Sequence, residues 1–180
     1  MLDLIFKLDY RVVHYINAKL RNPFFDYLNI AMTYLGSDVF ALGVILAMVF
    51  LPKDTFRPFA IHGAVTLTTS TIFVQILKRL IRRKRPFVLS KNLRSIRIGV
   101  DPYSFPSGHT TAAFALATSI SLLVVSPSIR LVFLLLAFGV GFSRVYLAVH
   151  YPSDVLAGAF IGSSFAYVVH LFMPALSQLV

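Results

Sequence analysis

The sequence predicts an all-α fold, a polytopic membrane helix bundle with about five transmembrane helices and an N-terminal amphipathic helix at the interface. Three observations support this prediction. Hydrophobic residues make up 57% of the 180 residues, and the mean hydropathy is +0.78, both typical of a chain that belongs in a bilayer. Four apolar stretches are long enough to cross a membrane. Conspicuous polar side chains gather where these stretches begin or end, where they cost less than inside lipid.

Each of the four stretches holds about 20 residues, enough to cross about 30 Å of hydrocarbon. A fifth span precedes them. Val39 to Leu51 is too short alone, but extending it back past Gly36 to Leu28 supplies the length. The four clear spans are Pro58 to Leu77, Pro106 to Ser126, Leu131 to Val149 and Val155 to Met173.

Residues 1–27 are expected to form an interfacial segment. Within it, apolar positions from Leu2 to Leu20 are interrupted by charges, a pattern typical of an amphipathic helix lying on the membrane. The segment is too charged to span the bilayer. Its acids and the lack of a small-residue cleavage site argue against a signal peptide, so it is expected to belong to the mature protein. The charged positions are Asp3, Lys7, Asp9, Arg11 and Lys19.

A single domain, residues 1–180, is expected at this length. The absence of cysteine excludes structural disulfides, Cys-ligated zinc and thiol catalysis. Seventeen Lys and Arg against seven Asp and no Glu give a net charge of +10. Such a balance predicts affinity for anionic lipid head groups or an anionic substrate. The lipid bilayer is therefore an expected partner and nucleic acid is not, while the sequence gives no indication of oligomeric state.

Three short strings within residues 78–154 carry the candidate chemistry. Counting membrane crossings places residues 78–105 and 143–154 on the same face, together with the N-terminal segment. The strings therefore predict a phosphate-handling site at one membrane surface. They are Lys78 with Arg85 and Pro86, then Pro106 to His109, then Ser143 and Arg144 followed by His150 and Asp154.

The second string is expected to open a helix. Pro106 suits a first turn, so the amides of Ser107, Gly108 and His109 would be unpaired donors ready for a phosphate. Gly108 would let the anion approach closely. Taken alone, the string fits equally a capped transmembrane helix whose histidine sits at the interface.

In the third string, Pro152 marks a helix start, so Asp154 falls in the first turn and His150 just before it. A four-residue spacing lets the two side chains touch. A carboxylate bonded to one ring nitrogen fixes the tautomer and frees the other nitrogen to attack or to take a proton. The alternative is a structural His–Asp pair that caps the helix.

A basic run follows the span that ends at Leu77. For Arg79, Arg82, Arg83 and Lys84 the sequence favours an anchoring role, with long side chains reaching the lipid head groups. Lys78 and Arg85 differ because Pro86 ends the helix and turns the chain toward the site. Near the end of the predicted span Leu131 to Val149, the guanidinium of Arg144 can bind two phosphate oxygens at once.

The three strings together resemble the three-part signature of the type 2 phosphatidic acid phosphatase (PAP2) superfamily, without a departure. Further cues resemble its bacterial undecaprenyl-diphosphatase branch, although lipid A phosphatases and phosphatidylglycerophosphate phosphatases are also similar. The signature is Lys78-x6-Arg85-Pro86, Pro106-Ser107-Gly108-His109 and Ser143-Arg144-x5-His150-x3-Asp154, and the further cues are Asn17, Pro23, Asp26 and Gly36.

The resemblance implies that His150 attacks phosphorus to form a phosphohistidine, with Asp154 holding its ring. His109 would protonate the departing oxygen and then help to activate water. No metal and no cofactor are implied, in keeping with the absence of Glu and the scatter of the Asp residues. The residues implied to hold the phosphoryl oxygens are Lys78, Arg85, Ser107, Gly108 and Arg144.

The expected function is thus metal-independent hydrolysis of a phosphate or diphosphate group on a membrane lipid. Undecaprenyl diphosphate, converted to undecaprenyl phosphate, is the favoured substrate. Lipid A 1-phosphate, phosphatidylglycerophosphate and phosphatidic acid are alternatives. An anionic-lipid-binding or transport protein would also be helical and basic, but it would not need His109, His150 and Asp154 at helix ends. Vanadate-dependent haloperoxidases share the phosphate-site signature but are larger and soluble.

The expected location is the bacterial inner membrane. Fourteen of the seventeen Lys and Arg lie on the side of the candidate site, which by the positive-inside rule would place the site in the cytoplasm. The resemblance implies the periplasmic or outer face, which is the favoured orientation, since substrate binding rather than topology explains Lys78, Arg85 and Arg144.

Three histidines and four glycines are given structural roles. His62 and His170 are each 16 residues from the site, about 24 Å along a helix, and are expected at the opposite interface. His14 lies on the side of the site but in the amphipathic helix. Gly139, Gly141, Gly158 and Gly162 are expected to let helices pack closely.

Overall fold

A computed structural model describes residues 2–176 of the chain, which form helices and connecting loops without strands in that range. The helices, in chain order, are α1 (Leu2–Lys19), α2 (Pro23–Tyr34), α3 (Asp38–Phe50), α4 (Lys53–Ile81), α5 (Pro86–Leu89), α6 (Gly108–Leu123), α7 (Pro127–Tyr146) and α8 (Pro152–Leu176). The all-α prediction is confirmed.

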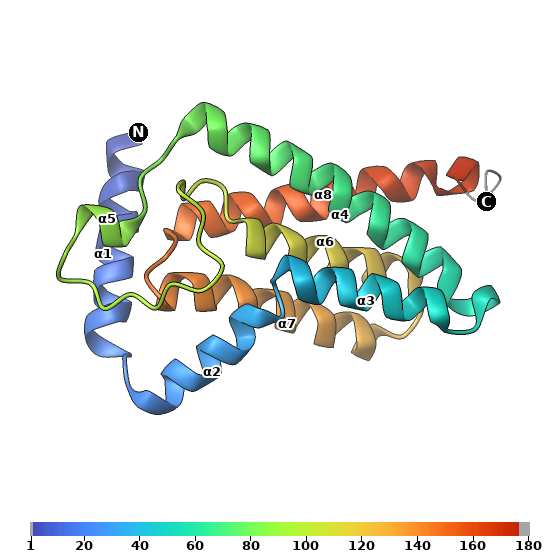
Figure 1. Cartoon of the computed structure of the whole chain (residues 1–180), viewed down its shortest axis with the longest axis horizontal. Helices are drawn as coiled ribbons and strands as arrows, with labels where there is room; N and C mark the ends of the chain where they lie inside the picture. The colour runs from blue at the N-terminus through green and yellow to red at the C-terminus, as the bar shows by residue number, and fades with distance from the viewer. Residues whose placement is uncertain (1, 177–180) are drawn as a thin grey trace.

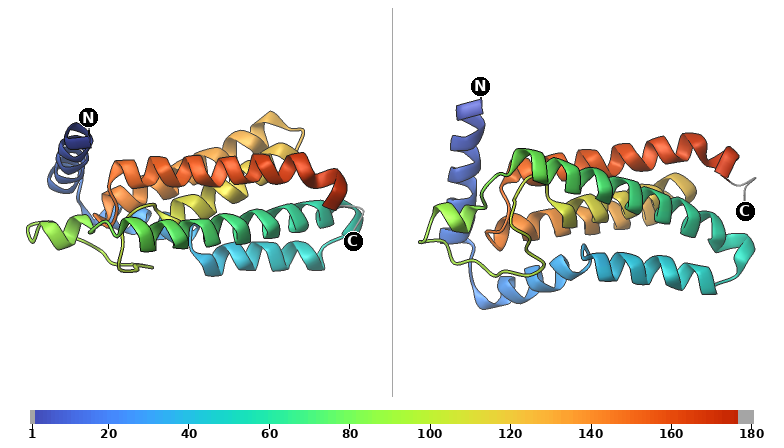
Figure 2. Two further views of the ribbon diagram at one scale, coloured as in Figure 1. Left: turned by 90° about the horizontal axis from the view of Figure 1, so that it is seen from above. Right: turned by 45° about the horizontal axis from the view of Figure 1, so that its top comes forward.

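The long helices form one elongated bundle. Helices α3, α4, α6, α7 and α8 run roughly along its length, whereas α1 lies across one end (Figures 1 and 2). Helix α6 is the most deeply placed, since it packs against α4, α7 and α8 and buries most of its residues. The long connection between α5 and α6 folds back over the same end as α1 (Figure 1).

Three helical stretches are long and apolar enough to cross a membrane: Phe56–Leu89, Pro127–Tyr146 and Pro152–Met173. Helices α2 and α3 together meet the same criterion as a pair bent by 52°. Helix α6 has 16 residues, about 24 Å of helix, and lies alongside these stretches. Four of the five predicted spans therefore correspond to the α2–α3 pair, α4, α7 and α8, whereas the predicted span Pro106 to Ser126 corresponds to α6, which is too short to meet the same criterion.

The first predicted span is broken rather than continuous. Helix α2 ends at Tyr34, and Ser37 caps α3 by accepting a hydrogen bond from the Phe40 amide at 3.2 Å. Gly36, between them, lies so close to its neighbours that a Cβ there would come within 2.8 Å of the His109 carbonyl oxygen. The break thus brings this part of the chain against the start of α6.

Two glycines of α8 allow it to approach α6 closely. A Cβ at Gly158 would lie 2.7 Å from the Ser107 carbonyl oxygen, and one at Gly162 would lie 2.8 Å from the Ala115 amide nitrogen. Neither position has room for a larger side chain. The predicted role of these glycines in close packing is confirmed.

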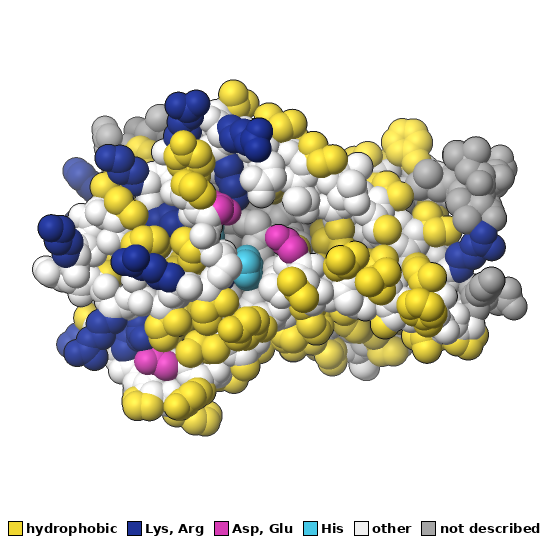
Figure 3. Space-filling model, in the orientation of Figure 1, with side chains coloured by type: hydrophobic (Ala, Val, Ile, Leu, Met, Phe, Trp, Pro, Cys, Tyr) yellow, Lys and Arg dark blue, Asp and Glu magenta, His cyan; other side chains and the backbone are white. Residues whose placement is uncertain are grey.

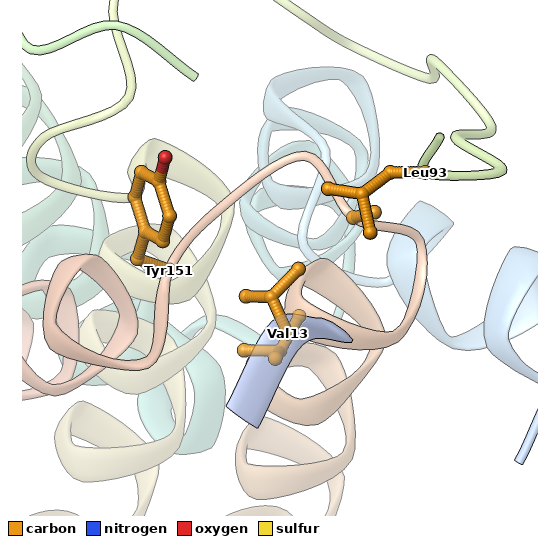
Figure 4. Packing of buried hydrophobic residues seen from close by; sticks show 5 residues of the cluster. Val13, Leu93 and Tyr151 are labelled. Atoms are coloured by element: carbon orange, nitrogen blue, oxygen red, sulfur yellow. The ribbon is translucent and has the colours of Figure 1, made fainter. Parts of the chain in front are cut away.

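The amphipathic helix α1 is fixed to the end of the bundle by a small apolar cluster. Val13 of α1 packs with Leu93 of the α5–α6 connection and with Tyr151 of the link between α7 and α8 (Figure 4). The outer face of α1 exposes apolar side chains, among them Leu4, Phe6 and Tyr15. This distribution fits a helix that rests on the membrane surface.

The prediction that His62 lies at an interface is wrong. Its side chain has no exposed surface, and its ring centroid lies 5.8 Å from that of His170 within the bundle. The Nδ1 atom of His62 is 3.4 Å from the Thr66 hydroxyl. Because α4 continues well before His62 to Lys53, this histidine lies inside the helix and not near its end.

Candidate active site

The three strings of the sequence meet around a cavity of about 350 Å³ at the end of the bundle that carries α1. Its walls include Lys78 from α4, Asp101 from the α5–α6 connection, Gly108 and His109 from α6, and His150 from the α7–α8 link. Figure 3 shows this hollow, with a histidine and acidic side chains at its edge and most Lys and Arg side chains on the same end of the molecule.

His150 belongs to a tight link between α7 and α8. The chain turns there through Ala148, which has a positive φ of 56°, and the His150 amide donates to the Arg144 carbonyl at 3.2 Å. The His150 side chain is 2% exposed. Burial lowers its pKa well below the ordinary value of 6.5, and the nearby positive charges of Arg85 and Arg144 lower it further. The ring is therefore neutral at pH 7.

The two ring nitrogens of His150 face different groups. Nδ1 lies 3.5 Å from Asp154 Oδ2, at the limit of a hydrogen bond and without the geometry of a formed one. Nε2 lies 3.0 Å from Arg85 Nη1. The predicted contact between His150 and Asp154 is thus present as a close approach through Nδ1. The other ring nitrogen, Nε2, is the one that lies beside Arg85.

Asp154 is fixed in the first turn of α8 by hydrogen bonds to both carboxylate oxygens. Oδ2 accepts from the Tyr151 amide at 2.8 Å, and Oδ1 accepts from Arg83 Nη1 at 2.6 Å. The side chain has no exposed surface. Its carbonyl oxygen accepts from the Ser107 amide at 3.0 Å, which ties α8 to the start of α6.

Lys78 and Arg85 share one carboxylate, that of Asp101. Lys78 Nζ lies 2.9 Å from Asp101 Oδ2, and Arg85 Nη2 lies 3.0 Å from Oδ1. Both cations are buried, whereas the Asp101 side chain is 41% exposed. Burial alone would raise the pKa of Asp101, but Lys78 and Arg85 hold it below its ordinary value. The carboxylate of Asp101 therefore forms ion pairs with the two cations that were predicted to bind phosphate.

Arg144 is completely buried, and both of its Nη atoms donate to the protein, whereas its Nε atom has no hydrogen-bond partner among the described residues. Nη1 donates to Thr33 Oγ1 at 2.6 Å and to the Ile98 carbonyl at 2.9 Å, while Nη2 donates to the Gly99 carbonyl at 3.3 Å. The guanidinium thus connects α7 to α2 and to the connection that covers the cavity.

The start of α6 differs by two residues from the prediction. Helix α6 begins at Gly108 rather than at Pro106, with Ser107 as its N-cap. The Ser107 amide is not free, because it donates to Asp154, and its hydroxyl accepts from the Thr110 hydroxyl at 2.9 Å. The amides that head the helix are those of Gly108 and His109, which have no acceptor within the helix. A Cβ at Gly108 would meet open space, so the cavity reaches this backbone.

The ring of His109 lies against Gly99 of the covering connection. A Cβ at Gly99 would come within 2.7 Å of His109 Nε2, and its φ of 56° is one that side chains disfavour. Only glycine fits there. The Nε2 atom of His109 is buried without a hydrogen-bond partner in the described part of the chain, so an acid–base role is open to it.

The anchoring role predicted for Arg83 is wrong. Its side chain is 13% exposed and forms ion pairs with Asp9 of α1 at 2.7 Å and with Asp154 at 2.6 Å. It therefore points into the protein, beside the site. Arg79, Arg82 and Lys84 are exposed, in keeping with the prediction for them.

Sequence reasoning missed four contributors: Asp9, Thr33, Gly99 and Asp101. Each reaches the site from a segment outside the three strings, so spacing along the chain could not reveal it. One signal was available. Asp101 is an acidic residue five positions before Pro106, in a connection that had to cross the face of the site.

Chemically, the cavity places a neutral histidine among fixed positive charges and helix-terminal amides. Such a site can bind a tetrahedral anion and offer it a nucleophilic nitrogen. The carboxylate of Asp154 beyond the ring can stabilise the positive charge that attack would create on the imidazole.

A family model described as PAP2 superfamily matches residues 59–178 of the chain. Among curated proteins, the chain is 33% identical over 76% of its length to the Bacitracin transport permease protein BcrC of Bacillus licheniformis. It is 36% identical over 58% of its length to a Lipid A 1-phosphatase of Rhizobium etli. The matched parts make up 66% and 47% of those relatives' own lengths. An Undecaprenyl-diphosphatase of Sulfolobus acidocaldarius is 28% identical over 69% of the chain.

Two crystal structures share the fold. That of Aquifex aeolicus LpxE has a TM-score of 0.77 and 28% identity, covering 88% of this chain and 92% of the other. That of a PAP2-type phosphatidylglycerolphosphate phosphatase from Bacillus subtilis has a TM-score of 0.82 and 24% identity, covering 94% and 86%. The second likeness concerns the fold alone.

Proposed function

The chain belongs to the PAP2 superfamily, and from that premise we propose that it hydrolyses a phosphate or diphosphate group on a membrane lipid through a phosphohistidine. The observation that carries the proposal is the neutral, buried His150, whose Nε2 lies beside Arg85 in a cavity lined by Lys78 and His109. A charged imidazolium could not attack phosphorus, and burial keeps the ring uncharged.

In the first step, Nε2 of His150 attacks phosphorus and the bond to the leaving oxygen breaks. His109, protonated while the anionic phosphate is bound, donates its proton to that oxygen and becomes neutral, and the new N–P bond leaves a positive imidazole that Asp154 stabilises across 3.5 Å. In the second step, His109 takes a proton from water, the water oxygen attacks phosphorus, and the N–P bond breaks. Inorganic phosphate leaves and His150 is neutral again.

The negative charge of the phosphoryl group is balanced by protein groups. Lys78 and the residues that head α6 line the cavity, Arg85 lies beside His150 in its wall, and Arg144 adds a further buried positive charge. Ser107 and Gly108 shape the helix start that presents those amides. Because these groups supply the positive charge, the proposed reaction needs no metal ion.

A lipid substrate is supported by an apolar groove of about 470 Å³ between α3 and α4. Asp38 and Thr71 line both this groove and the polar cavity, so the two spaces adjoin. A phosphate in the cavity could therefore belong to a molecule whose hydrocarbon lies in the groove, facing the bilayer.

Undecaprenyl diphosphate is the proposed physiological substrate, giving undecaprenyl phosphate. The support is the similarity to an Undecaprenyl-diphosphatase. Relatives named lipid A phosphatases make lipid A the first alternative. The proposed location is a bacterial inner membrane, with the site on its periplasmic or outer face.

A transport function is the second candidate, because one relative carries the name of a transport permease. The site argues for chemistry instead. Transport does not require a neutral histidine between a carboxylate and a cation, and such a group is costly to bury without a use.

The test is release of inorganic phosphate in detergent with excess EDTA, measured across undecaprenyl diphosphate, lipid A, phosphatidylglycerophosphate and phosphatidic acid. Release from at least one lipid is expected, fastest from undecaprenyl diphosphate. His150→Ala is expected to lower kcat by at least about a thousandfold, and acid-labile phosphate on the wild-type protein should mark the intermediate. No release by the wild type with any lipid, or more than a tenth of the activity in folded His150→Ala, would overturn the mechanism.

A further inference from the structure

Arg83 lies in the short connection between α4 and α5, outside the residues that line the cavity. Its guanidinium bridges two carboxylates on different helices, with Nη1 2.6 Å from Asp154 Oδ1 and Nη2 2.7 Å from Asp9 Oδ2. The same group lies over the ring of Tyr151 at 4.1 Å from its centroid. The ring and the two carboxylates together fix the plane of the guanidinium.

Asp9 holds the other end of this arrangement. It comes from α1, is 3% exposed, and accepts a hydrogen bond from the Ser153 amide at 2.9 Å as well as one from the Ser153 hydroxyl. Ser153 directly precedes Asp154. The carboxylate of α1 thus contacts both Arg83 and the first turn of α8.

The two carboxylate oxygens of Asp154 have different partners, one on the side of the site and the other on the side of Arg83. Oδ2 faces the Tyr151 amide and His150, whereas Oδ1 faces Arg83. Rotation of the carboxylate about its last bond would exchange the two oxygens or move both away from the ring. The short contact with Arg83 resists this rotation and places a positive charge against the buried carboxylate.

We propose that Arg83 is a positioning residue that holds Asp154 toward His150, and that Asp9 of the interfacial helix α1 holds Arg83 in turn. The site is thereby supported from the membrane surface by a chain of contacts from Asp9 through Arg83 and Asp154 to His150. The inference rests on the proposed role of His150 as nucleophile. It adds two residues that the three sequence strings do not contain.

The main test compares Arg83→Gln, Arg83→Lys and the exposed control Arg79→Gln in the full-length protein in detergent. Three quantities are measured: kcat, KM and the inhibition constant of inorganic phosphate. Arg83→Gln is expected to lower kcat by about ten- to a hundredfold, by analogy with the outer partners that orient metal-binding histidines. The inhibition constant of phosphate should stay within about twofold of wild type, because Lys78 and Arg85 remain.

Arg83→Lys should recover part of the lost kcat, since an ammonium can contact one carboxylate but not bridge two. Arg79→Gln should behave as wild type. A kcat within twofold of wild type in Arg83→Gln would overturn the proposal. So would equal losses of kcat and of phosphate binding, because these would place Arg83 in the phosphate site or in the fold and not behind Asp154.

Asp9→Asn tests the link to α1 with nearly unchanged shape. It should lower kcat less than Arg83→Gln, and the double variant should be no slower than Arg83→Gln alone, because both changes break one chain of contacts. Independent, multiplicative losses would overturn the role given to Asp9. Failure of the phosphatase proposal would appear separately, as a wild type that releases no phosphate.

Discussion

At the scale of single residues, the charge state of His150 decides what the site can do. Its burial and the neighbouring Arg85, Arg144 and Lys78 all lower its pKa well below 6.5. Asp101 acts in the opposite direction but does not reverse this effect. The same cations that can bind the phosphate anion also keep His150 uncharged, so anion binding and nucleophilic attack place compatible demands on the site.

This charge state predicts an unusual response to acid. The neutral ring of the free enzyme should persist as pH falls through 6.5, so kcat/KM should show no half-loss from His150 near that pH and should fall with this group only at more acidic pH. Stability should respond differently, because His150 binds a proton near pH 6.5 only in the unfolded chain. The free energy of unfolding should therefore decrease below about pH 6.5, while folded enzyme stays active. Brief kcat/KM assays and denaturant melts from pH 5 to 8 measure both. A kcat/KM titration centred at 6.5 that followed His150 would contradict the prediction.

Asp101 is the second residue whose charge matters, because it occupies Lys78 and Arg85 when no phosphate is bound. A substrate phosphate must displace it or share the cations with it. Asp101→Asn should therefore tighten inhibition by inorganic phosphate, by about tenfold if one competing charge is worth about 1.4 kcal/mol. The inhibition constant at pH 7 measures this effect. Weaker inhibition in the variant would mean that the carboxylate holds the cations in place and does not compete for them.

At the scale of elements, the end of α4 shows how far sequence reasoning reaches. The basic run was predicted to contain cations of the site and cations that anchor the chain to lipid head groups. The structure agrees for Lys78 and Arg85, which are buried, and for Arg79, which is exposed. Arg83 was assigned to the wrong kind. Its partners Asp9 and Asp154 lie 74 and 71 residues away, so no local pattern could identify it.

The same limit applies to the other helices. Apolar length predicted the bundle, and Pro152 correctly predicted the start of α8. The break between α2 and α3 was missed because it depends on contact of Gly36 with α6 and α7, which is a property of packing and not of hydropathy. The start of α6 was predicted two residues too early. Serine is a favoured N-cap residue, and Ser107 takes that position, so the helix begins at Gly108 and not at Pro106.

The end of α4 also gives a prediction. Arg85→Ala should lower kcat by about a hundredfold or more, as expected for a donor that strengthens its contact in the transition state. Arg79→Ala, which removes an exposed side chain in the last turn of α4, should stay near wild type when both are assayed in micelles with a short-chain substrate. Comparable losses would show that the whole run attracts anions diffusely.

At the scale of the whole molecule, the polar cavity of the site adjoins an apolar groove on the lipid-facing surface. The polar cavity lies at the end of the bundle beneath α1 and the α5–α6 connection, and the apolar groove between α3 and α4 begins where the cavity ends. The bend of 52° between α2 and α3 lies beside this junction. A phosphate can therefore be held among buried cations while the attached hydrocarbon stays at the lipid-facing surface.

This arrangement predicts that the groove distinguishes long lipids from short ones. Thr68 lines the groove and is exposed, so Thr68→Trp should fill part of it without disturbing the core. KM for a long-chain lipid phosphate should rise by about tenfold, as expected when an apolar contact worth about 1.4 kcal/mol is lost. KM for a water-soluble short-chain phosphate should not change, because the cavity beyond Thr71 is untouched.

The control for this prediction is Leu135→Trp, which adds the same bulk to an exposed position on α7 away from the groove. It should leave both KM values at the wild-type level. If Thr68→Trp changed neither substrate, the hydrocarbon would have to leave the cavity by another route, and the groove would be only a seam between α3 and α4. If it weakened both substrates equally, the added ring would be acting on the phosphate site itself, and the two spaces would not serve separate parts of one lipid.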